Sequence, residues 1–152
     1  MSGVSLSEFA DKMQEIMPVI MKEFASRHSS ELFKAKVTLP QFLILNFLNV
    51  SGETKMKVLA QFMRVTTAAM TGVVDRLVRD SYATRIYDPK DRRIIKIKLT
   101  SKGSGLVKKV NQQRQQMIVK LFGKISESDR QEYLRILLQI KDILTKENFN
   151  IQ

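Results

Sequence analysis

The chain has no cysteine and a single histidine, His28, among its 152 residues. Without thiols it can form neither disulfides nor thiolate metal sites, and it cannot sense oxidants through a thiol. Zinc and copper sites favour imidazole and thiolate ligands, so a metal sensor built here would have only carboxylates. We therefore expect no metal and no cofactor, and we expect His28 to be a surface or interface side chain.

Long apolar runs and an export leader are also missing. No run approaches the roughly 18 apolar residues that a membrane-spanning helix needs. The first residues lack a basic segment followed by an apolar block, which is the pattern of a secretion signal. These absences predict a cytoplasmic protein without a membrane partner, folded as a single domain over residues 1–152.

Positive charge is abundant but confined to the middle of the chain. The formal net charge is +11. Residues 53–124 hold 17 lysines and arginines against 5 acids, whereas the rest of the chain holds 9 against 10. Surfaces without an electrostatic role usually mix both signs, as the two ends do here. The segregation favours a polyanion partner, with nucleic acid ahead of a membrane surface or a basic patch without a binding role.

Capping signals and hydrophobic periodicity predict a mainly α fold with a small β-hairpin. Helices are expected at residues 5–36, 38–51, 55–63, 66–80 and 101–122, with a last one opening at Ser126. The β-branched and aromatic residues at 83–87 and 94–99 predict the two strands. This order is typical of a winged helix-turn-helix lobe, here residues 37–100, between helical regions at 5–36 and 101–148.

The helical regions at both ends carry longer apolar stripes than such a small lobe can cover. An uncovered stripe of this length favours pairing of two identical subunits. The expected dimerisation residues are Leu6, Phe9, Met13, Tyr133, Leu137, Ile140 and Leu144. The sequence therefore predicts a homodimer joined through its terminal helices.

The helix predicted at 66–80, the reading helix, separates a buried face from a face for DNA. Its inner face on a helical wheel holds Met70, Val73, Val74 and Leu77. The residues expected to contact DNA are Thr66, Thr67, Ala68, Thr71, Gly72, Arg76 and Arg79. Small side chains on this face would let the helix settle deep into a major groove, with methyl groups against thymine. Close packing of a neighbouring helix is the alternative explanation for the glycine.

The tip of the predicted hairpin, residues 88–93, is a small cationic probe. Three of its last four residues are basic, and Lys90 and Arg92 are expected to contact DNA. Arg92 is the candidate for insertion into a narrow A·T-rich minor groove, with a solvated loop arginine as the alternative. Asp91 and Arg93 are expected to stabilise the tip by pairing.

The spacing of several residues adds a family resemblance. The pattern D-x-R-x5-L-T-x-x-G is matched by Asp91-Arg92-Arg93, Leu99-Thr100 and Gly103. The pattern T-x-x-x-D-R-L…R is matched by Thr71, Asp75-Arg76-Leu77 and Arg85, and a common opening of the second helix by Leu39-Pro40-Gln41-Phe42. Over nearly its full length the chain resembles the MarR family of bacterial and archaeal transcription regulators.

The resemblance implies a homodimer, joined through the first, fifth and sixth helices, that binds a pseudo-palindrome. It also implies that Arg92 is the minor-groove residue and that Asp91 and Arg93 form the pair that stabilises the wing. Two positions depart from the family pattern. Gly72 stands where a larger polar residue is common, and Ser81 stands where glycine is usual after the reading helix, at an exit that favours glycine.

We interpret the chain as a sequence-specific regulator of transcription, in the role of a repressor, that binds double-stranded DNA. A non-specific architectural DNA-binding protein is the alternative, and a protein-interaction scaffold built on the end helices is a third interpretation. Asp88 and Asp91 are paired carboxylates, but the sequence places no cleft, base or glycine-rich loop beside them. We therefore predict that the protein is not an enzyme.

Members of the family often respond to small phenolic or anionic compounds. Between residues 101 and 124 the chain carries no acid and six basic residues: Lys102, Lys108, Lys109, Arg114, Lys120 and Lys124. We hypothesise that some of them face a cleft and bind an anionic effector that releases the operator. A solvated or DNA-flanking basic face is the alternative.

Overall fold

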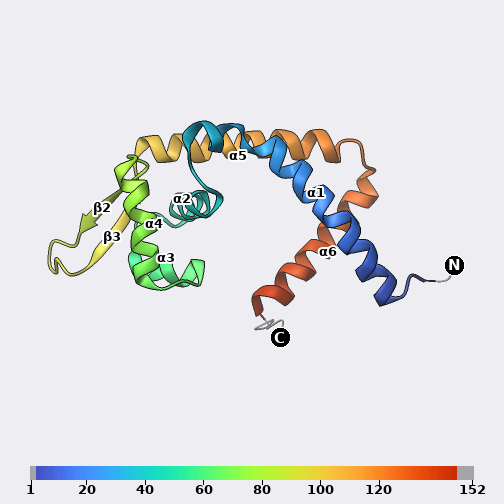
Figure 1. The fold of residues 1–152 in the computed structure, drawn as a ribbon, viewed down its shortest axis with the longest axis horizontal. Helices are drawn as coiled ribbons and strands as arrows, with labels where there is room; N and C mark the ends of the chain where they lie inside the picture. Colours follow the sequence, from blue (N-terminus) through green and yellow to red (C-terminus); the bar gives the residue numbers. More distant parts are fainter. Residues whose placement is uncertain (1–2, 147–152) are drawn as a thin grey trace. The chain divides into compact units, whose positions relative to one another are not determined.

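The computed structural model describes residues 3–146, apart from the side chains of residues 28 and 29. The expectation for the His28 side chain, and the last two residues of the helical region predicted at 101–148, therefore lie outside the described residues. The elements along the chain are α1 (Leu6–Ala35), α2 (Leu39–Ser51), β1 (Thr54–Lys55), α3 (Met56–Met63), α4 (Thr67–Arg79), β2 (Ala83–Tyr87), β3 (Ile95–Leu99), α5 (Ser101–Phe122) and α6 (Glu127–Lys146) (Figure 1). The mainly α winged helix-turn-helix fold is confirmed.

The chain divides into two compact units, residues 1–112 and residues 113–152, and α5 runs through the boundary. The first unit contains the winged lobe. Among the described residues, no helix is both long and apolar enough to span a membrane.

Side-chain caps explain where the helices begin. The Ser5 hydroxyl accepts the Glu8 amide (3.2 Å) while the Glu8 carboxylate accepts the Ser5 amide (2.9 Å). Thr38 and Gln41 form the same reciprocal pair at the start of α2. Each such cap satisfies amides that a helix start leaves without partners, and its loss typically costs about 1 kcal/mol. Both of these predicted helix starts are confirmed.

The small sheet has three strands rather than two. β2 and β3 form the predicted antiparallel hairpin, and β1 pairs with the other edge of β3, with Thr54 opposite Ile97. The helix predicted at 55–63 begins one residue later, at Met56, and β1 is a strand that the sequence does not predict. A two-residue strand has no periodicity of its own, because its hydrogen bonds depend on β3, which lies some 40 residues further along the chain.

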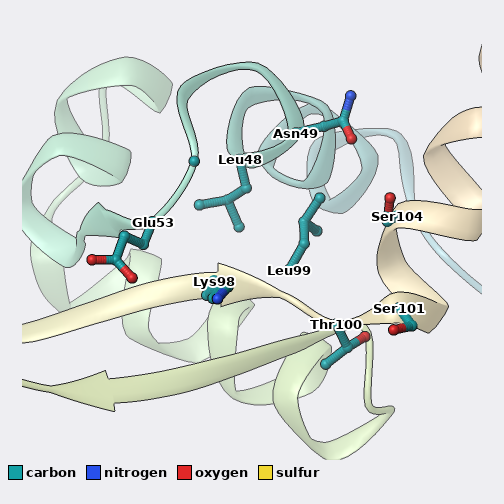
Figure 2. Close-up of a pocket in the computed structure, with 9 residues that line it drawn as sticks. Leu48, Asn49, Glu53, Lys98, Leu99, Thr100, Ser101 and Ser104 are labelled. Carbon is teal, nitrogen blue, oxygen red and sulfur yellow. The ribbon is translucent and has the colours of Figure 1, made fainter.

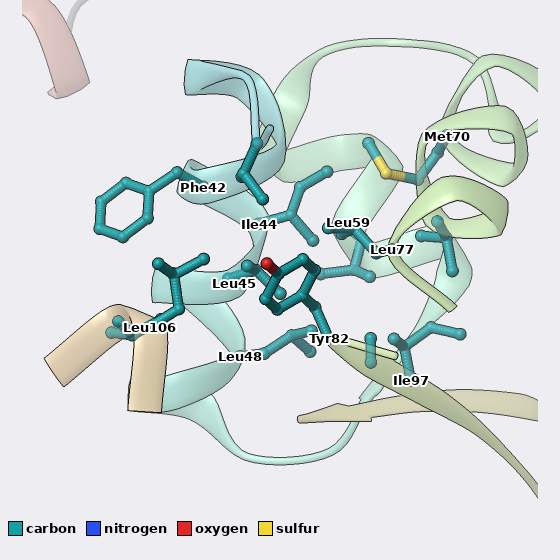
Figure 3. Close-up of a cluster of buried hydrophobic side chains, with 14 of the residues drawn as sticks. Phe42, Ile44, Leu45, Leu48, Leu59, Met70, Leu77, Tyr82, Ile97 and Leu106 are labelled. Atoms are coloured by element: carbon teal, nitrogen blue, oxygen red, sulfur yellow. The ribbon is translucent and has the colours of Figure 1, made fainter. Parts of the chain in front are cut away.

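The core of the first unit gathers around α2 (Figure 3). Figure 3 labels the largest of its side chains, among them Phe42 and Leu45 from α2, Leu59 from α3 and Ile97 from β3. The first half of α5 adds Leu106, Val107 and Val110, and α4 adds Met70, Val74 and Leu77. The inner face predicted for the reading helix is therefore confirmed, except that Val73 is only half-buried at its edge. This core packs against the inner face of α4 and leaves the outer face of the helix exposed to solvent.

The exit from α4 requires a left-handed residue. Ser81 has a φ of 63°, in the region that glycine occupies most easily. Its amide donates to the Val78 carbonyl (3.0 Å), and the Tyr82 amide donates to the Leu77 carbonyl (2.8 Å), which closes the end of the helix. The position where the family resemblance expects glycine is thus a strained position filled by serine.

Candidate nucleic-acid interface

The outer face of α4 is open along its whole length. Thr66, Thr67, Ala68, Gly72, Arg76 and Arg79 are exposed, and Thr71 is half-buried with its hydroxyl on the Thr67 carbonyl (2.8 Å). A Cβ atom added at Gly72 would meet nothing within 4 Å. Packing of a neighbouring helix therefore does not explain this glycine within the described chain. The small outer face that the sequence predicts is present and accessible.

The start of α4 suits a phosphate group. The Thr66 side chain caps the helix by accepting the Ala69 amide (3.1 Å). The first two helical amides, of Thr67 and Ala68, have no carbonyl one turn earlier and lie at the positive end of the helix dipole. Exposed amides at that end can donate hydrogen bonds to an anion.

The wing tip is held by carboxylates that accept backbone amides. Asp88 Oδ1 accepts the amides of Lys90 (2.8 Å) and Asp91 (3.3 Å), and Asp91 Oδ1 accepts the amide of Arg93 (3.0 Å). These amides, that of Lys90 first and that of Asp91 second, lower the pKa of the Asp88 carboxyl. The tip thus presents Lys90, Arg92 and Arg93, all exposed, on a hydrogen-bonded turn.

The manner in which the tip is stabilised differs from the expected side-chain pair. Asp91 binds the backbone of Arg93 rather than its guanidinium in the described structure. A carboxylate reaches an amide two residues further along without ordering a long side chain, so this bond forms at a lower entropic cost. Asp88 lies in the predicted tip but was given no stabilising role from the sequence; it accepts two amides and is a main bracing residue. The sequence signal for this role was the Asp-Pro-Lys order, because an aspartate in a turn commonly accepts the amide two residues later.

Asp75 lies on the outer face of α4, where a free carboxylate would repel phosphate. Its carboxylate forms an ion pair with Arg85 of β2, and this pair joins the helix to the wing. At the end of the helix, Nε and Nη2 of Arg79 donate to the two carboxylate oxygens of Asp80 (3.0 and 3.2 Å). The hydrogen bond from Arg79 is the main cause of the lowered pKa of Asp80. The sequence analysis did not predict either pair, although both involve residues that it had singled out.

The two lysines of β3, Lys96 and Lys98, differ in their surroundings. Lys96 pairs with Glu53 beside β1 (3.3 Å), whereas Lys98 is exposed. With this pair, all five acids of the basic segment 53–124 are bound within the chain. The 17 lysines and arginines of this segment outnumber its five acids, so its surface keeps a positive net charge.

A cleft of about 500 Å³ lies between the end of α2 and the start of α5 (Figure 2). Leu48 and Leu99 are its apolar lining, and its polar lining includes Lys98, Glu53 and the hydroxyls of Thr100, Ser101 and Ser104. None of the six basic residues behind the effector hypothesis lines it. In the described residues no three histidines or carboxylates gather as a metal site would need.

The predicted dimerisation residues are exposed in their own units. Leu6, the most exposed of them, has 84% of its surface accessible, and Phe9 and Met13 follow it along α1. In the second unit no residue of α6 is buried, and Leu137, Ile140 and Leu144 lie exposed along one stripe. Stripes of this size are unusual on an isolated soluble chain and mark contact surfaces.

The fold and this positively charged face define a winged helix-turn-helix protein. The family model of the MarR family matches residues 37–95. The HTH-type transcriptional repressor MdtR of Bacillus subtilis (strain 168) is 32% identical over 103 residues, which are 68% of this chain and 61% of MdtR.

Solved structures agree with this match. A MarR family protein from Bacillus stearothermophilus is similar with a TM-score of 0.78 and 21% identity, over 93% of this chain and 99% of that one. A variant of S. aureus MepR, solved bound to an oligodeoxyribonucleotide, has a TM-score of 0.65 and 20% identity, over 87% and 97%. The chain belongs to the MarR family and is a transcriptional regulator with a winged DNA-binding lobe, not an enzyme.

Proposed function

We propose that the protein is a sequence-specific repressor that binds a pseudo-palindromic operator as a homodimer. In this proposal α4 of each subunit enters a major groove, and the wing places Arg92 in the minor groove beside it. Thr66, Thr67, Ala68, Thr71, Gly72, Arg76, Arg79, Lys90 and Arg92 form the contact surface. The role of a repressor follows MdtR, and binding to DNA follows the MepR variant solved with an oligodeoxyribonucleotide.

One observation carries the proposal: the basic segment has no free acid. Each of its five carboxylates is occupied by a cation or by backbone amides of the same chain. On a surface that merely needs solubility, exposed acids and bases would remain interspersed. Here the cation partners of Asp75 and Asp80 weaken the repulsion of phosphate at α4, while Arg76, Lys90 and Arg92 stay exposed.

The homodimer is supported by the exposed apolar stripes of α1 and α6. Two copies that cover each other's stripes would remove several large side chains from water, at roughly 25 cal/mol per Å² of apolar surface. A twofold axis would also present two α4 helices to one duplex, and half-sites about 34 Å apart lie one helical turn from each other. Operator symmetry would then mirror protein symmetry.

Selection of duplexes from a random library, followed by titration of the selected site and a scrambled control, tests the proposal. Specific binding exceeds non-specific binding by a factor on the order of 10³–10⁷ in such proteins. Equal affinity for both duplexes would instead support the architectural alternative. Sedimentation at micromolar concentration tests the dimer, and a single-subunit mass would contradict it.

We further propose that a small aromatic or anionic ligand releases the operator. The support is the amphipathic cleft beside Lys98 and, separately, the six cations without an acid in 101–124, which lie outside that cleft. Calorimetric titration with benzoate and salicylate is the direct test. Saturable binding that lowers operator affinity supports release, and the absence of binding contradicts it.

A further inference from the structure

The backbone that leaves α4 is gripped by the start of α5. Three successive carbonyls, those of Asp80, Ser81 and Tyr82, each accept a hydrogen bond from it. The donors are the Lys102 ammonium (2.8 Å to Asp80), the Thr100 hydroxyl (2.6 Å to Ser81) and the Thr100 amide (3.2 Å to Tyr82). We call this set of contacts the exit clasp.

The two segments of the exit clasp approach as closely as backbone allows. A Cβ atom added at Gly103 would lie 2.0 Å from the Tyr82 carbonyl oxygen, a distance that real side chains do not adopt. The Thr100 hydroxyl also accepts the Gly103 amide (3.1 Å) and so caps α5. One threonine therefore fixes both the start of α5 and the exit of α4.

Lys102 makes a second contact that ties in a third helix. Its ammonium lies 4.4 Å from the centre of the Tyr82 ring, over the ring face. Tyr82 is 7% exposed, and its hydroxyl donates to the carbonyl of Ala35, the last residue of α1 (3.3 Å). The ring face and the negative end of the α4 helix dipole both stabilise a cation at this position. The Tyr82 ring and the Lys102 ammonium thus link three helices: the end of α1, the end of α4 and the start of α5.

We infer that Lys102 is a positioning residue for DNA recognition, which acts by holding the exit of α4 rather than by contacting phosphate. The inference rests on the proposed function, because it requires that the protein discriminates between DNA sequences. Lys102 holds the exit of α4 through a charge-assisted hydrogen bond to the backbone carbonyl of Asp80. The Asp80 carboxylate is bound by Arg79, so Lys102 does not pair with it. Loss of the bond lets α4 and the wing change their angle while the core beneath stays packed.

The nearest competing role for an exposed lysine beside a reading helix is direct contact with a phosphate. The two roles differ in their dependence on salt. Each lost phosphate contact lowers the slope of log affinity against log salt by about one, and weakens all sequences alike. A positioning residue affects the specific site and leaves the slope unchanged.

Three variants separate these roles: Lys102→Met, which keeps the apolar stem without the charge; Lys102→Arg, which keeps a cation that can donate and stack; and Lys109→Met. Lys109 is exposed two helical turns further along α5, so it controls for the loss of one charge from the same face. Affinity for the selected duplex and for a scrambled duplex is measured across a salt series. Thermal unfolding of each variant is recorded in parallel.

Lys102→Met is expected to weaken binding to the selected duplex about tenfold, the equivalent of one lost charged hydrogen bond. Its affinity for the scrambled duplex and its salt slope stay within error of Lys109→Met, and Lys102→Arg restores specific binding to within about twofold. Equal losses on both duplexes with a lower slope, or no loss at all, would overturn the inference. If the wild type itself does not discriminate, the proposed function fails first, and this inference fails with it.

Should Lys102→Met not fold, Lys102→Gln takes its place, since glutamine keeps a donor without the charge. Hydrogen exchange of the DNA-free protein provides an independent measurement. Faster exchange of the amides at residues 80–82 in the Lys102 variant than in the wild type, with the amides of α2 unchanged, supports the exit clasp. Unchanged exchange at those amides contradicts it.

Discussion

Gly72 offers a test in which stability and DNA binding move in opposite directions. A glycine inside a helix costs about 1 kcal/mol relative to alanine, and a Cβ at position 72 would meet nothing within 4 Å. Gly72→Ala should therefore stabilise the fold by about that amount, which raises Tm by roughly 2–4 °C in a protein of this size. In the operator complex the same methyl would stand where α4 approaches the groove most closely. Overpacking by one methyl typically costs about 1–3 kcal/mol, so specific affinity should fall about fivefold or more.

A matched control for this variant exists in the chain. Gly105 lies inside α5, and a Cβ added there also meets nothing within 4 Å. Gly105→Ala should give a similar gain in Tm with no change in operator affinity. Scanning calorimetry and fluorescence anisotropy measure the two quantities. A Gly72→Ala variant that binds the selected duplex as tightly as the wild type would refute the close approach of α4 to DNA, and a loss of Tm would contradict the open face.

Four further outcomes follow from the structure. Arg92→Ala should weaken specific binding by about 1–3 kcal/mol and relax the preference at the outer A·T positions; an unchanged footprint would remove Arg92 from the minor groove. Thr71→Asp, which adds a carboxylate to the open face of α4, should abolish DNA binding while sedimentation still shows the dimer. Ser81→Gly should raise the free energy of unfolding in urea by about 0.5–1 kcal/mol, because the φ of 63° strains serine; a destabilised variant would contradict that strain. The chemical shift of the Lys90 amide should follow the protonation of Asp88, with a midpoint below the ordinary carboxyl pKa of about 3.9. The amide lowers the pKa of Asp88, so the bond persists at the ordinary pKa and is lost only as the pH falls through the lowered one. A midpoint at the ordinary value would contradict the hydrogen-bonded turn.

Local signals made the helices and the hairpin predictable from the sequence. The caps at Ser5, Thr38 and Thr66 act within three residues, and the structure contains all three. The inner face of α4 follows from a period of 3.6 residues, which any helix must obey. The strand Ala83–Tyr87 has the predicted bounds; Thr84, Ile86 and Tyr87 favour a strand, and Asp88-Pro89 ends it.

Two of the features that the sequence did not reveal depend on partners distant along the chain, whereas the Arg79–Asp80 pair and the bonds to Asp88 are local. Asp75 meets Arg85 only because β2 returns beside α4, and Lys102 reaches the Asp80 carbonyl across the whole wing. In the sequence Lys102 was one of six cations on a basic helix, with nothing to separate it from Lys109. Contacts of this kind are decided by tertiary packing, so a residue's type and neighbours do not specify them.

The occupied carboxylates of the basic segment bear on how the protein finds its operator. Under the proposed function, the excess of positive charge in this segment would attract any stretch of duplex, so copies not on the operator would bind random genomic DNA. Movement along that DNA shortens the search for one site among millions. It also makes the number of copies in the cell a determinant of operator occupancy, because random duplex competes for the same surface.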